Sequence, residues 1–167
     1  DRALKELKRL AVRVGKASDA ESLLGLEGAA AALYFSRFSR MLKRGDDFDF
    51  TRRNRRPPVD PVNALLSFTY GLLARELTAV SLSVGLDPYL GVFHRPRFGR
   101  PALALDLAEE FRPLVADSVV IGLINNGEVR RSHFVEADGA VSLTQQGRRT
   151  VLKAYERRVT TEFTHPV

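Results

Sequence analysis

The chain contains no cysteine, which excludes disulfide bonds, thiolate nucleophiles and thiolate metal ligands. Any metal site must use oxygen and imidazole ligands, which favours magnesium or manganese over structural zinc. No apolar run reaches the roughly 18–20 residues that a membrane-spanning helix needs. The first residues have the pattern of a charged amphipathic helix rather than a secretory signal. We therefore expect a cytoplasmic protein with no membrane partner.

Motifs of several common enzyme classes are also missing. The sequence has no GxSxG elbow of Ser-His-Asp hydrolases, and neither GxxxxGK[ST] nor GxGxxG, which cradle nucleotide phosphates. Positive charge is present instead, with a net charge of +6 and arginine far more frequent than lysine. Arginine binds phosphate through two parallel hydrogen bonds, so this composition favours a nucleic-acid partner. A GC-rich genome also raises arginine content, but it does not explain why the arginines cluster.

Hydrophobic periodicity predicts one helical domain. The chain has 167 residues, 44% of them hydrophobic, which is enough for one sizeable core. Helical patterns with their end signals cover residues 2–16, Ser18 or Asp19 to about Lys43, 61–84 (between Asp60-Pro61 and Gly85), 101–125, and Thr144 to about Phe163. Pro113 should kink the fourth helix, and Asp138-Gly139 should turn a hairpin. We predict a mainly α fold, a helical bundle with one short β-hairpin near residues 132–143.

The fourth predicted helix carries a cluster of acidic residues. Asp106, Glu109 and Glu110 are spaced i, i+3 and i+4, so they lie on one helical face and repel by roughly 0.2–0.5 kcal/mol per pair. His94 lies among arginines in the preceding loop. Histidine and carboxylates together form a plausible shell for a divalent metal acting on phosphate. The bland alternatives are a solvated acidic face, or pairing of the glutamates with Arg112 or another chain.

A second unusual carboxylate is Glu27, within the run LLGLEGAAAALYF. Its neighbours at helical spacing are all apolar, and none of them is basic. A carboxylate that is half-buried without a partner is costly unless it is protonated, paired across helices or bound to metal. The small residues around it would let another helix approach closely. The alternative is a rim position facing solvent.

An arginine-rich segment follows the second helix. Four arginines occur within five residues: Arg52, Arg53, Arg55 and Arg56. Such a segment can clamp a phosphate backbone, and Phe48 and Phe50 just upstream could stack on unpaired bases. The alternative is a mobile, solvated turn. The remaining histidines, His133 and His165, have no acidic pattern around them, so we expect both to be surface residues.

Four segments together resemble a known family. They read GLEGAAAALYF, RRPPVDPVNALLSFTYGLL, LDPYLGVFH and GRPALALDLAEEFRPLVAD, and they resemble the CRISPR-associated endonuclease/integrase that is first in the Cas numbering. The resemblance covers nearly the whole chain. It implies that residues 1–167 are a single helical catalytic domain, a fragment of a longer chain without the family's N-terminal β domain and last helices.

The resemblance also implies roles for individual residues. By their sequence contexts, Glu27, His94 and Glu109 match the family's catalytic residues, which bind a divalent metal, Mg²⁺ or Mn²⁺. Asp106, Asn63 and Tyr70 match positions that support the site. The residues expected to hold the DNA backbone are Arg52, Arg53, Arg55, Arg56, Arg95 and Arg97. The implied reaction is metal-dependent transesterification, in which the 3′-hydroxyl end of a spacer precursor is joined to repeat DNA.

The partners that the resemblance implies belong to spacer acquisition in antiviral defence. They are spacer-precursor DNA, the CRISPR repeat and leader, a second copy bound through the absent β domain, a small ferredoxin-like CRISPR-associated subunit, and an iron–sulfur nuclease that is fused or associated. One alternative is a helical nucleic-acid-binding module without catalysis. Another is a protein-interaction domain whose acidic face binds a basic partner.

Salt dependence separates the nucleic-acid interpretations from the protein-interaction one. Because arginine–phosphate contacts release counterions, the affinity of the protein for duplex DNA should fall steeply as salt rises, about tenfold or more between 50 and 200 mM. Fluorescence anisotropy with labelled DNA measures this slope. An affinity that stays flat with salt would favour the protein-interaction domain.

Overall fold

The protein is a helical bundle with one β-hairpin, as the sequence predicts. The computed structural model describes residues 2–43 and 48–162. In chain order its elements are α1 (Arg2–Val14), α2 (Ala20–Phe38), η1 (Ser39–Met41), α3 (Pro61–Ser83), α4 (Ala102–Phe111), η3 (Arg112–Asp117), α5 (Ser118–Asn125), η4 (Arg131–His133), β1 (Phe134–Ala137), β2 (Ala140–Leu143) and α6 (Gln145–Val159). None of the helices in these two stretches is long and apolar enough to cross a membrane.

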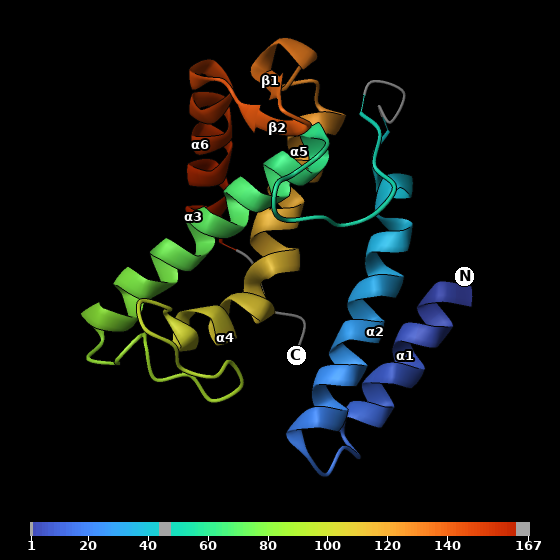
Figure 1. Cartoon of the computed structure of the whole chain (residues 1–167), viewed down its shortest axis with the longest axis vertical. Helices are drawn as coiled ribbons and strands as arrows, with labels where there is room; N and C mark the ends of the chain where they lie inside the picture. The colour runs from blue at the N-terminus through green and yellow to red at the C-terminus, as the bar shows by residue number, and fades with distance from the viewer. Residues whose placement is uncertain (1, 44–47, 163–167) are drawn as a thin grey trace.

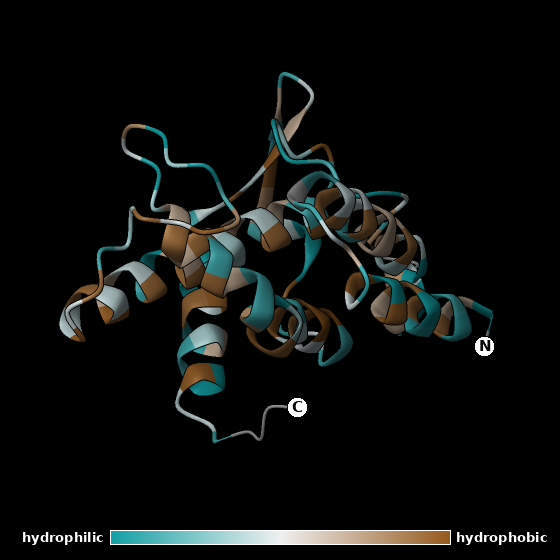
Figure 2. Cartoon of the chain, turned by 90° about the horizontal axis from the view of Figure 1, so that it is seen from below, coloured by the Kyte–Doolittle hydropathy of each residue, from teal (hydrophilic) through white to brown (hydrophobic). Residues whose placement is uncertain are grey.

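The elements form two groups around the central helix α3. Figure 1 shows α1 and α2 side by side as a helical hairpin, with α3 to α6 on the other side of the molecule. Helix α3 contacts α4, η3, α5, β2 and α6. Figure 2 shows hydrophobic and hydrophilic segments alternating along the helices, which is typical of helices that bury one face. The hairpin α1–α2 therefore forms one flank of the molecule, and the assembly around α3 forms the other.

Side-chain caps begin the helices where the sequence predicts. The carboxylate of Asp19 accepts a hydrogen bond from the backbone N–H of Ser22 at 2.7 Å. Asp60 caps α3 in the same way, with Pro61 at the first helical position. Helix α2 ends at Phe38 and continues only as the short turn η1, so the predicted helix to Lys43 is slightly too long.

The main core lies between α2, α3, α5 and α6. Its fully buried side chains include Phe38, Leu65, Leu66, Leu123 and Ile124. Phe48 and Phe50 also belong to it, at 3% and 8% exposure, with ring contacts to Phe134, Phe35 and Phe38. The prediction that Phe48 and Phe50 are free to stack on bases is wrong, because the large apolar area of these rings is buried in the core.

The acidic helix changes its pitch at Pro113. Helix α4 ends at Phe111, residues Arg112–Asp117 form the π-helical turn η3, and α5 continues from Ser118. Proline cannot donate the backbone hydrogen bond of a regular α-helix, so the predicted irregularity takes this form. The wider turn places Asp117 in the interior, where it is 2% exposed.

The β-hairpin connects the core to the segment before α3. Its turn residues Asp138 and Gly139 have φ values of 52° and 72°, as a tight two-residue hairpin turn requires. The backbone N–H of Val141 in β2 donates to the carbonyl of Pro58 at 2.8 Å. This bond holds residues 48–60, called here the arginine loop, against the sheet.

Helix α6 and the residue preceding β1 depart from the sequence predictions. The helix is capped by Thr144 as predicted but ends at Val159, and Phe163 and His165 lie outside the described residues. His133 is buried rather than on the surface, so that prediction is wrong. Its Nδ1 accepts a hydrogen bond from the backbone N–H of Arg130 at 3.0 Å. A buried imidazole needs such a partner, and only the fold provides it.

A buried carboxylate joins α2, α3 and η3. The Tyr34 hydroxyl donates to Oδ2 of Asp117 at 2.9 Å, and the Tyr70 hydroxyl donates to Oδ1 at 2.7 Å. Burial raises the pKa of Asp117, although the two tyrosine donors and the nearby guanidinium groups of Arg112 and Arg53 act in the opposite direction. Three segments far apart in the sequence therefore meet at one polar contact inside the protein.

We predict that Asp117→Asn becomes more stable relative to the wild type as pH rises. The folded-state pKa of Asp117 lies above its ordinary value of 3.8, so the folded wild type binds more protons than the unfolded chain. Its free energy of unfolding therefore falls as pH rises from about 4 until folded Asp117 ionises. Asparagine does not titrate. Denaturant unfolding across this pH range measures the free energy of unfolding of both proteins. The value for the variant minus the value for the wild type should rise with pH and then level off.

A matched variant controls for the loss of one negative charge. Asp138→Asn changes an exposed carboxylate in the hairpin turn, and asparagine tolerates the positive φ there. A stability difference for Asp117→Asn that falls as pH rises would contradict the conclusion that burial dominates the pKa of Asp117.

Candidate functional site

One pocket collects the side chains that the sequence marks for chemistry. It has a volume of about 830 Å³ and lies between α2, the arginine loop, α4, η3 and residues 84–101, called here the histidine loop. Glu27, His94 and Glu109 all line it, each from a different segment. Five arginines line the same pocket, namely Arg55, Arg56, Arg97, Arg100 and Arg112. Such a surface fits an anionic ligand with several phosphate groups.

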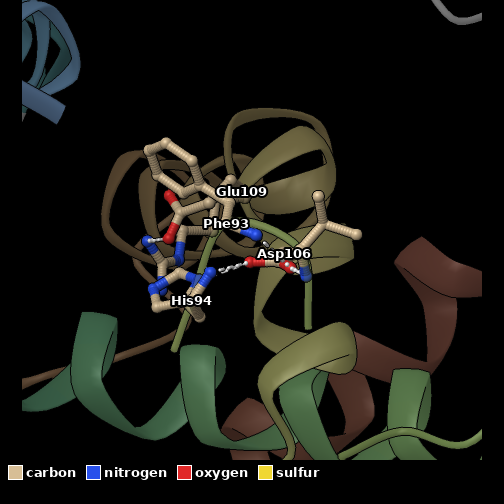
Figure 3. A network of polar contacts seen from close by, with 6 residues as sticks. Phe93, His94, Asp106 and Glu109 are labelled. Atoms are coloured by element: carbon tan, nitrogen blue, oxygen red, sulfur yellow. Dashed lines mark hydrogen bonds and ion pairs between the residues drawn. The ribbon is translucent and has the colours of Figure 1, made fainter. Parts of the chain in front are cut away.

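Asp106 holds the histidine loop in place. Its carboxylate accepts the backbone N–H groups of Val92, Phe93 and His94 at 2.7, 3.0 and 2.8 Å. It also bonds Nδ1 of the His94 ring at 2.7 Å, as Figure 3 shows. Burial raises the pKa of Asp106, but these hydrogen bonds outweigh it and hold the pKa below its ordinary value. With Nδ1 engaged, the His94 ring has Nε2 as its remaining nitrogen for a ligand.

Asp106 therefore has a partner other than a metal. The sequence hypothesis places a cation near the acidic face because three carboxylates repel one another. In the structure, backbone N–H groups and the His94 ring hydrogen-bond Asp106, and the guanidinium of Arg112 pairs with Glu109. Glu110 is exposed beside them and does not line the pocket. Repulsion on the helix is thus offset by the protein itself, and it gives no independent support for a metal.

Glu109 is held by a stacked guanidinium. Arg112, one turn later, pairs with the Glu109 carboxylate, as one alternative from the sequence anticipates. The guanidinium also lies over the Tyr70 ring, 4.8 Å from its centroid, and the Tyr70 hydroxyl bonds Asp117. Contacts therefore run without interruption from the buried Asp117 to the pocket wall at Glu109.

Glu27 is exposed on α2, so the expectation of a half-buried carboxylate is wrong. Among the described residues nothing packs on the two glycines near it, since a Cβ placed at Gly25 or Gly28 would meet no atom within 4 Å. Alanine and glycine tolerate exposure, so apolar neighbours alone do not establish burial. Glu27 also borders a second, largely apolar pocket of about 420 Å³, together with Asp106 and Glu109. It lies at the rim where α2 faces α4.

The three candidate ligands have the donor atoms that a divalent metal requires, but their side chains are not close enough together to bind one ion. Two carboxylates and one imidazole are donors that magnesium and manganese accept. Within residues 2–43 and 48–162, however, no three histidine, aspartate or glutamate side chains lie close enough together to hold an ion. Glu109 is engaged by Arg112, and Glu27 comes from a different element, α2 rather than α4. The donor set fits, and closing it requires these side chains to approach one another.

Asn63 organises the arginine loop rather than lining the pocket. It is completely buried, and its Oδ1 accepts hydrogen bonds from Arg53 Nη1 at 2.7 Å and the Asn54 backbone at 2.9 Å. Its Nδ2 donates to the Arg52 carbonyl and to Asp60 at 2.9 and 2.6 Å. Tyr70 likewise lies behind the pocket wall and stacks against guanidinium groups. The supporting roles of Asn63 and Tyr70 remain predictions. Their structural basis is the contacts by which these two side chains hold neighbouring residues in place.

The predicted DNA-binding arginines separate into different environments. Arg55, Arg56 and Arg97 line the main pocket. Arg53 turns inward to Asn63, Ser67 and the Tyr70 ring, which is 5.3 Å from its guanidinium carbon. Together with Arg52 and Arg55 it lines a smaller pocket against α2. Arg95 is exposed and lines neither pocket. The arginine cluster of the sequence thus contains arginines that line the main pocket as well as an arginine that hydrogen-bonds inside the protein.

Comparison with known proteins places this geometry in a family. The family model of the CRISPR associated protein Cas1 matches residues 1–157. The chain belongs to the Cas1 family. The CRISPR-associated exonuclease Cas4/endonuclease Cas1 fusion of Geobacter sulfurreducens is 57% identical over 156 residues, covering 91% of this chain and 28% of the relative. CRISPR-associated endonuclease Cas1 3 of Thermus thermophilus is 45% identical over 161 residues, covering 96% of this chain and 48% of the relative.

Solved structures of a Cas1 protein and of a casposase share the fold. A Cas1 protein from Thermotoga maritima superposes with a TM-score of 0.85 at 32% identity, over 91% of this chain and 49% of that one. A casposase bound to its integration product has a TM-score of 0.85 at 27% identity, over 93% of this chain and 44% of that one. The chain thus spans half or less of these Cas1 relatives and structures.

Two pocket arginines of this Cas1 chain escape the sequence prediction. Arg100 closes the histidine loop, where it follows Arg97 and Phe98 in the run RPRFGR. Arg112 lies three residues after Glu109 on the acidic helix. This spacing predicts contact between the two side chains, but from the sequence alone it predicts only a neutralising ion pair. Arg112 also stacks on Tyr70, which belongs to α3, so no local sequence pattern reveals this contact.

We predict that Asp106→Ala releases the histidine loop. The substitution removes the acceptor of three backbone N–H groups and of the His94 ring. Hydrogen exchange at the amides of residues 92–94 should accelerate by about tenfold or more, because hydrogen bonds to a charged acceptor are among the stronger ones. Exchange followed by mass spectrometry measures this change.

Asp87→Ala is the matched control within the same loop. The Asp87 carboxylate accepts only one backbone N–H that the structure describes, that of Tyr89 at 2.9 Å. Its effect should remain near residue 89. Unchanged exchange at residues 92–94 in Asp106→Ala would show that other contacts hold the loop.

Proposed function

We propose that this chain is the catalytic domain of a divalent-metal-dependent DNA endonuclease and integrase of CRISPR spacer acquisition. The observation that carries the proposal is the pocket in which Glu27, His94 and Glu109 face the same space as five arginines. Membership of the Cas1 family supports it, as does the likeness to a casposase whose structure holds an integration product. The substrates are the 3′-hydroxyl ends of a spacer precursor and the DNA of the CRISPR repeat.

The reaction is a transesterification at phosphorus. The 3′-hydroxyl oxygen of the incoming DNA forms a new bond to the phosphorus of a repeat phosphodiester, and the bond from that phosphorus to its former 3′ oxygen breaks. The incoming hydroxyl loses a proton and the leaving oxygen gains one. One phosphodiester replaces another, so the step needs neither a nucleotide cofactor nor a covalent enzyme intermediate. The protein must therefore align two DNA strands and stabilise negative charge on the phosphate.

The arginines supply the alignment. Arg55 and Arg56 reach the pocket from the arginine loop, and Arg97 and Arg100 reach it from the histidine loop. These two loops line the same pocket, so they can hold the backbones of two DNA strands, each through paired N–H groups on phosphate oxygens. Asn63 positions the arginine loop, and Asp106 positions the histidine loop. Each side chain does so by accepting hydrogen bonds from backbone N–H groups of its loop.

Glu27, His94 and Glu109 would hold Mg²⁺ or Mn²⁺. Such an ion polarises the scissile phosphate and stabilises the leaving oxygen. Asp106 fixes the His94 ring through Nδ1 and leaves Nε2 for ligation. Arg112 pairs with Glu109, so Glu109 would have to release this guanidinium in order to hold the ion. Arg112 would then be free to pair with a phosphate oxygen.

The proposed partners follow from the relatives. One relative is a fusion of exonuclease Cas4 with endonuclease Cas1, and one structural neighbour is a Cas6-RT-Cas1–Cas2 complex, with a TM-score of 0.86 at 31% identity. We propose that this chain works within a longer polypeptide, as part of a homodimer, beside a small ferredoxin-like subunit and a fused or associated iron–sulfur nuclease. DNA remains the partner of the pocket itself.

A non-catalytic nucleic-acid-binding module is the second candidate. The ion pair between Arg112 and Glu109 favours it, because the guanidinium engages one of the three proposed ligands. This candidate uses the pocket arginines and leaves Glu27 and His94 without a chemical role.

We predict that Glu27→Gln and His94→Ala abolish strand joining while DNA binding persists. The assay uses the full-length protein with its partner subunit and follows a labelled 3′-hydroxyl end into repeat DNA on a gel. Joining should fall by more than about 100-fold, because even outer partners of metal ligands typically cost 10–100-fold. Removal of Mg²⁺ and Mn²⁺ by a chelator should have the same effect on the wild type.

Glu21→Gln is the control for Glu27→Gln, since it removes an exposed carboxylate from the same helix away from the pocket. Joining that persists in both His94→Ala and Glu27→Gln would move the chemistry elsewhere. A wild type that binds DNA in a salt-sensitive way but never joins it would favour the binding module.

A further inference from the structure

The guanidinium of Arg112 belongs both to the pocket and to the protein interior. Its Nη1 pairs with Oε1 of Glu109, and its guanidinium carbon lies 4.8 Å from the centroid of the Tyr70 ring. The Arg112 side chain is 18% exposed, and its buried Nε has no hydrogen-bond partner among the described residues. A charge that is so largely shielded from water is costly to leave unpaired, so Arg112 depends on its ion pair with Glu109.

A second guanidinium lies close to the first. The guanidinium carbon of Arg53 lies 5.3 Å from the centroid of the same Tyr70 ring. Its pKa is lowered mainly by burial and in part by the positive charge of Arg112. Behind the ring stands Asp117, whose own pKa is raised by burial. Glu109 thus balances part of a positive cluster. When Glu109 leaves Arg112, the excess positive charge of this cluster attracts an anion.

Glu109 cannot serve a divalent ion and Arg112 equally well. A metal ion and a guanidinium bound to one carboxylate are like charges at short distance, and they repel each other. Arg112 therefore competes with an ion for Glu109, while Glu109 competes with a phosphate for Arg112. Both side chains line the main pocket, which is where a DNA phosphate would bind. Each ligand thus removes the competitor of the other.

We propose that the ion pair between Arg112 and Glu109 couples divalent-metal binding to phosphate binding in the pocket. This inference rests on the proposed function and deepens it by naming how the site is regulated. Without DNA, Arg112 engages Glu109, and the affinity of the site for metal is low. A DNA phosphate that pairs with Arg112 frees Glu109 and raises this affinity. By thermodynamic reciprocity, the ion raises the affinity for DNA by the same factor.

The test measures Mn²⁺ binding to the full-length protein with its partner subunit, from the electron paramagnetic resonance signal of free Mn²⁺. Binding is measured with and without a duplex whose 3′ ends lack the hydroxyl group, so that no strand joining occurs. The Mn²⁺ that the DNA alone binds is subtracted. Glu27→Gln, which loses one proposed ligand, shows how much Mn²⁺ binds at other sites of the assembly.

Two variants remove the guanidinium. Arg112→Gln and Arg112→Met both keep an unbranched side chain, so a result that they share does not depend on how either side chain packs. Thermal unfolding checks that each variant is folded. Arg97→Gln is the matched control for charge, because it removes one positive charge from the same pocket. Arg97 is exposed and pairs with no carboxylate among the described residues.

Without DNA, both Arg112 variants should bind Mn²⁺ about fivefold or more tightly than the wild type, because the competitor for Glu109 is gone. Arg97→Gln should lose affinity for DNA, but its affinity for Mn²⁺ without DNA should stay within about twofold of the wild type. Addition of DNA should raise the Mn²⁺ affinity of the wild type at least about fivefold more than that of the Arg112 variants. If Arg112 had only a structural role, its loss would lower the affinity for Mn²⁺ or leave it unchanged.

Three results would overturn the coupling and leave the proposed function standing. They are Arg112 variants that bind Mn²⁺ no more tightly than the wild type without DNA, an equal gain in Arg97→Gln, and a wild type whose Mn²⁺ affinity does not rise with DNA. The third result decides the question even if neither Arg112 variant folds. If the wild type and Glu27→Gln bind the same amount of Mn²⁺ with and without DNA, both the proposed metal site and this inference are wrong.

Discussion

The carboxylate of Asp106 is the contact on which the candidate site depends. It is the shared acceptor of three consecutive backbone N–H groups and of the His94 ring. The other contacts of the histidine loop with α4 include the backbone bonds from Leu103 and Ala104 to the Pro88 carbonyl. Pro88 precedes the three N–H groups, so the part of the loop that carries them relies on Asp106. The position of His94 and the orientation of its ring follow from this one side chain on α4.

A second chain of contacts supports the site from inside. Asp117 binds Tyr34 and Tyr70, Tyr70 stacks under Arg112, and Arg112 pairs with Glu109. Burial of an acidic group is normally unfavourable, but here the two hydroxyl donors satisfy both carboxylate oxygens. The π-helical turn after Pro113 brings Asp117 inward, so an irregular helix connects the core to the pocket.

Local sequence signals predicted the fold well and the site only partly. Caps at Asp19, Asp60 and Thr144 act over three or four residues, so they can be recognised without tertiary information. The resemblance named Glu27, His94 and Glu109, which line the pocket, but the burial of His133 and the exposure of Glu27 depend on which elements cover them. Long-range contacts of this kind leave no periodic trace. For the same reason the sequence could not separate the inward-turned Arg53 from the arginines that face the pocket.

The way in which α2 is anchored makes the width of the pocket sensitive to the angle of that helix. The residues of α2 that join the core are Tyr34, Phe35 and Phe38, near its C-terminal end, while Glu27 lies about two turns before them. At 1.5 Å per residue, Glu27 is about 10 Å from that anchor, and a tilt of about 10° would move it by roughly 2 Å. The spacing between Glu27 and α4 therefore depends on the angle at which α2 leaves the core.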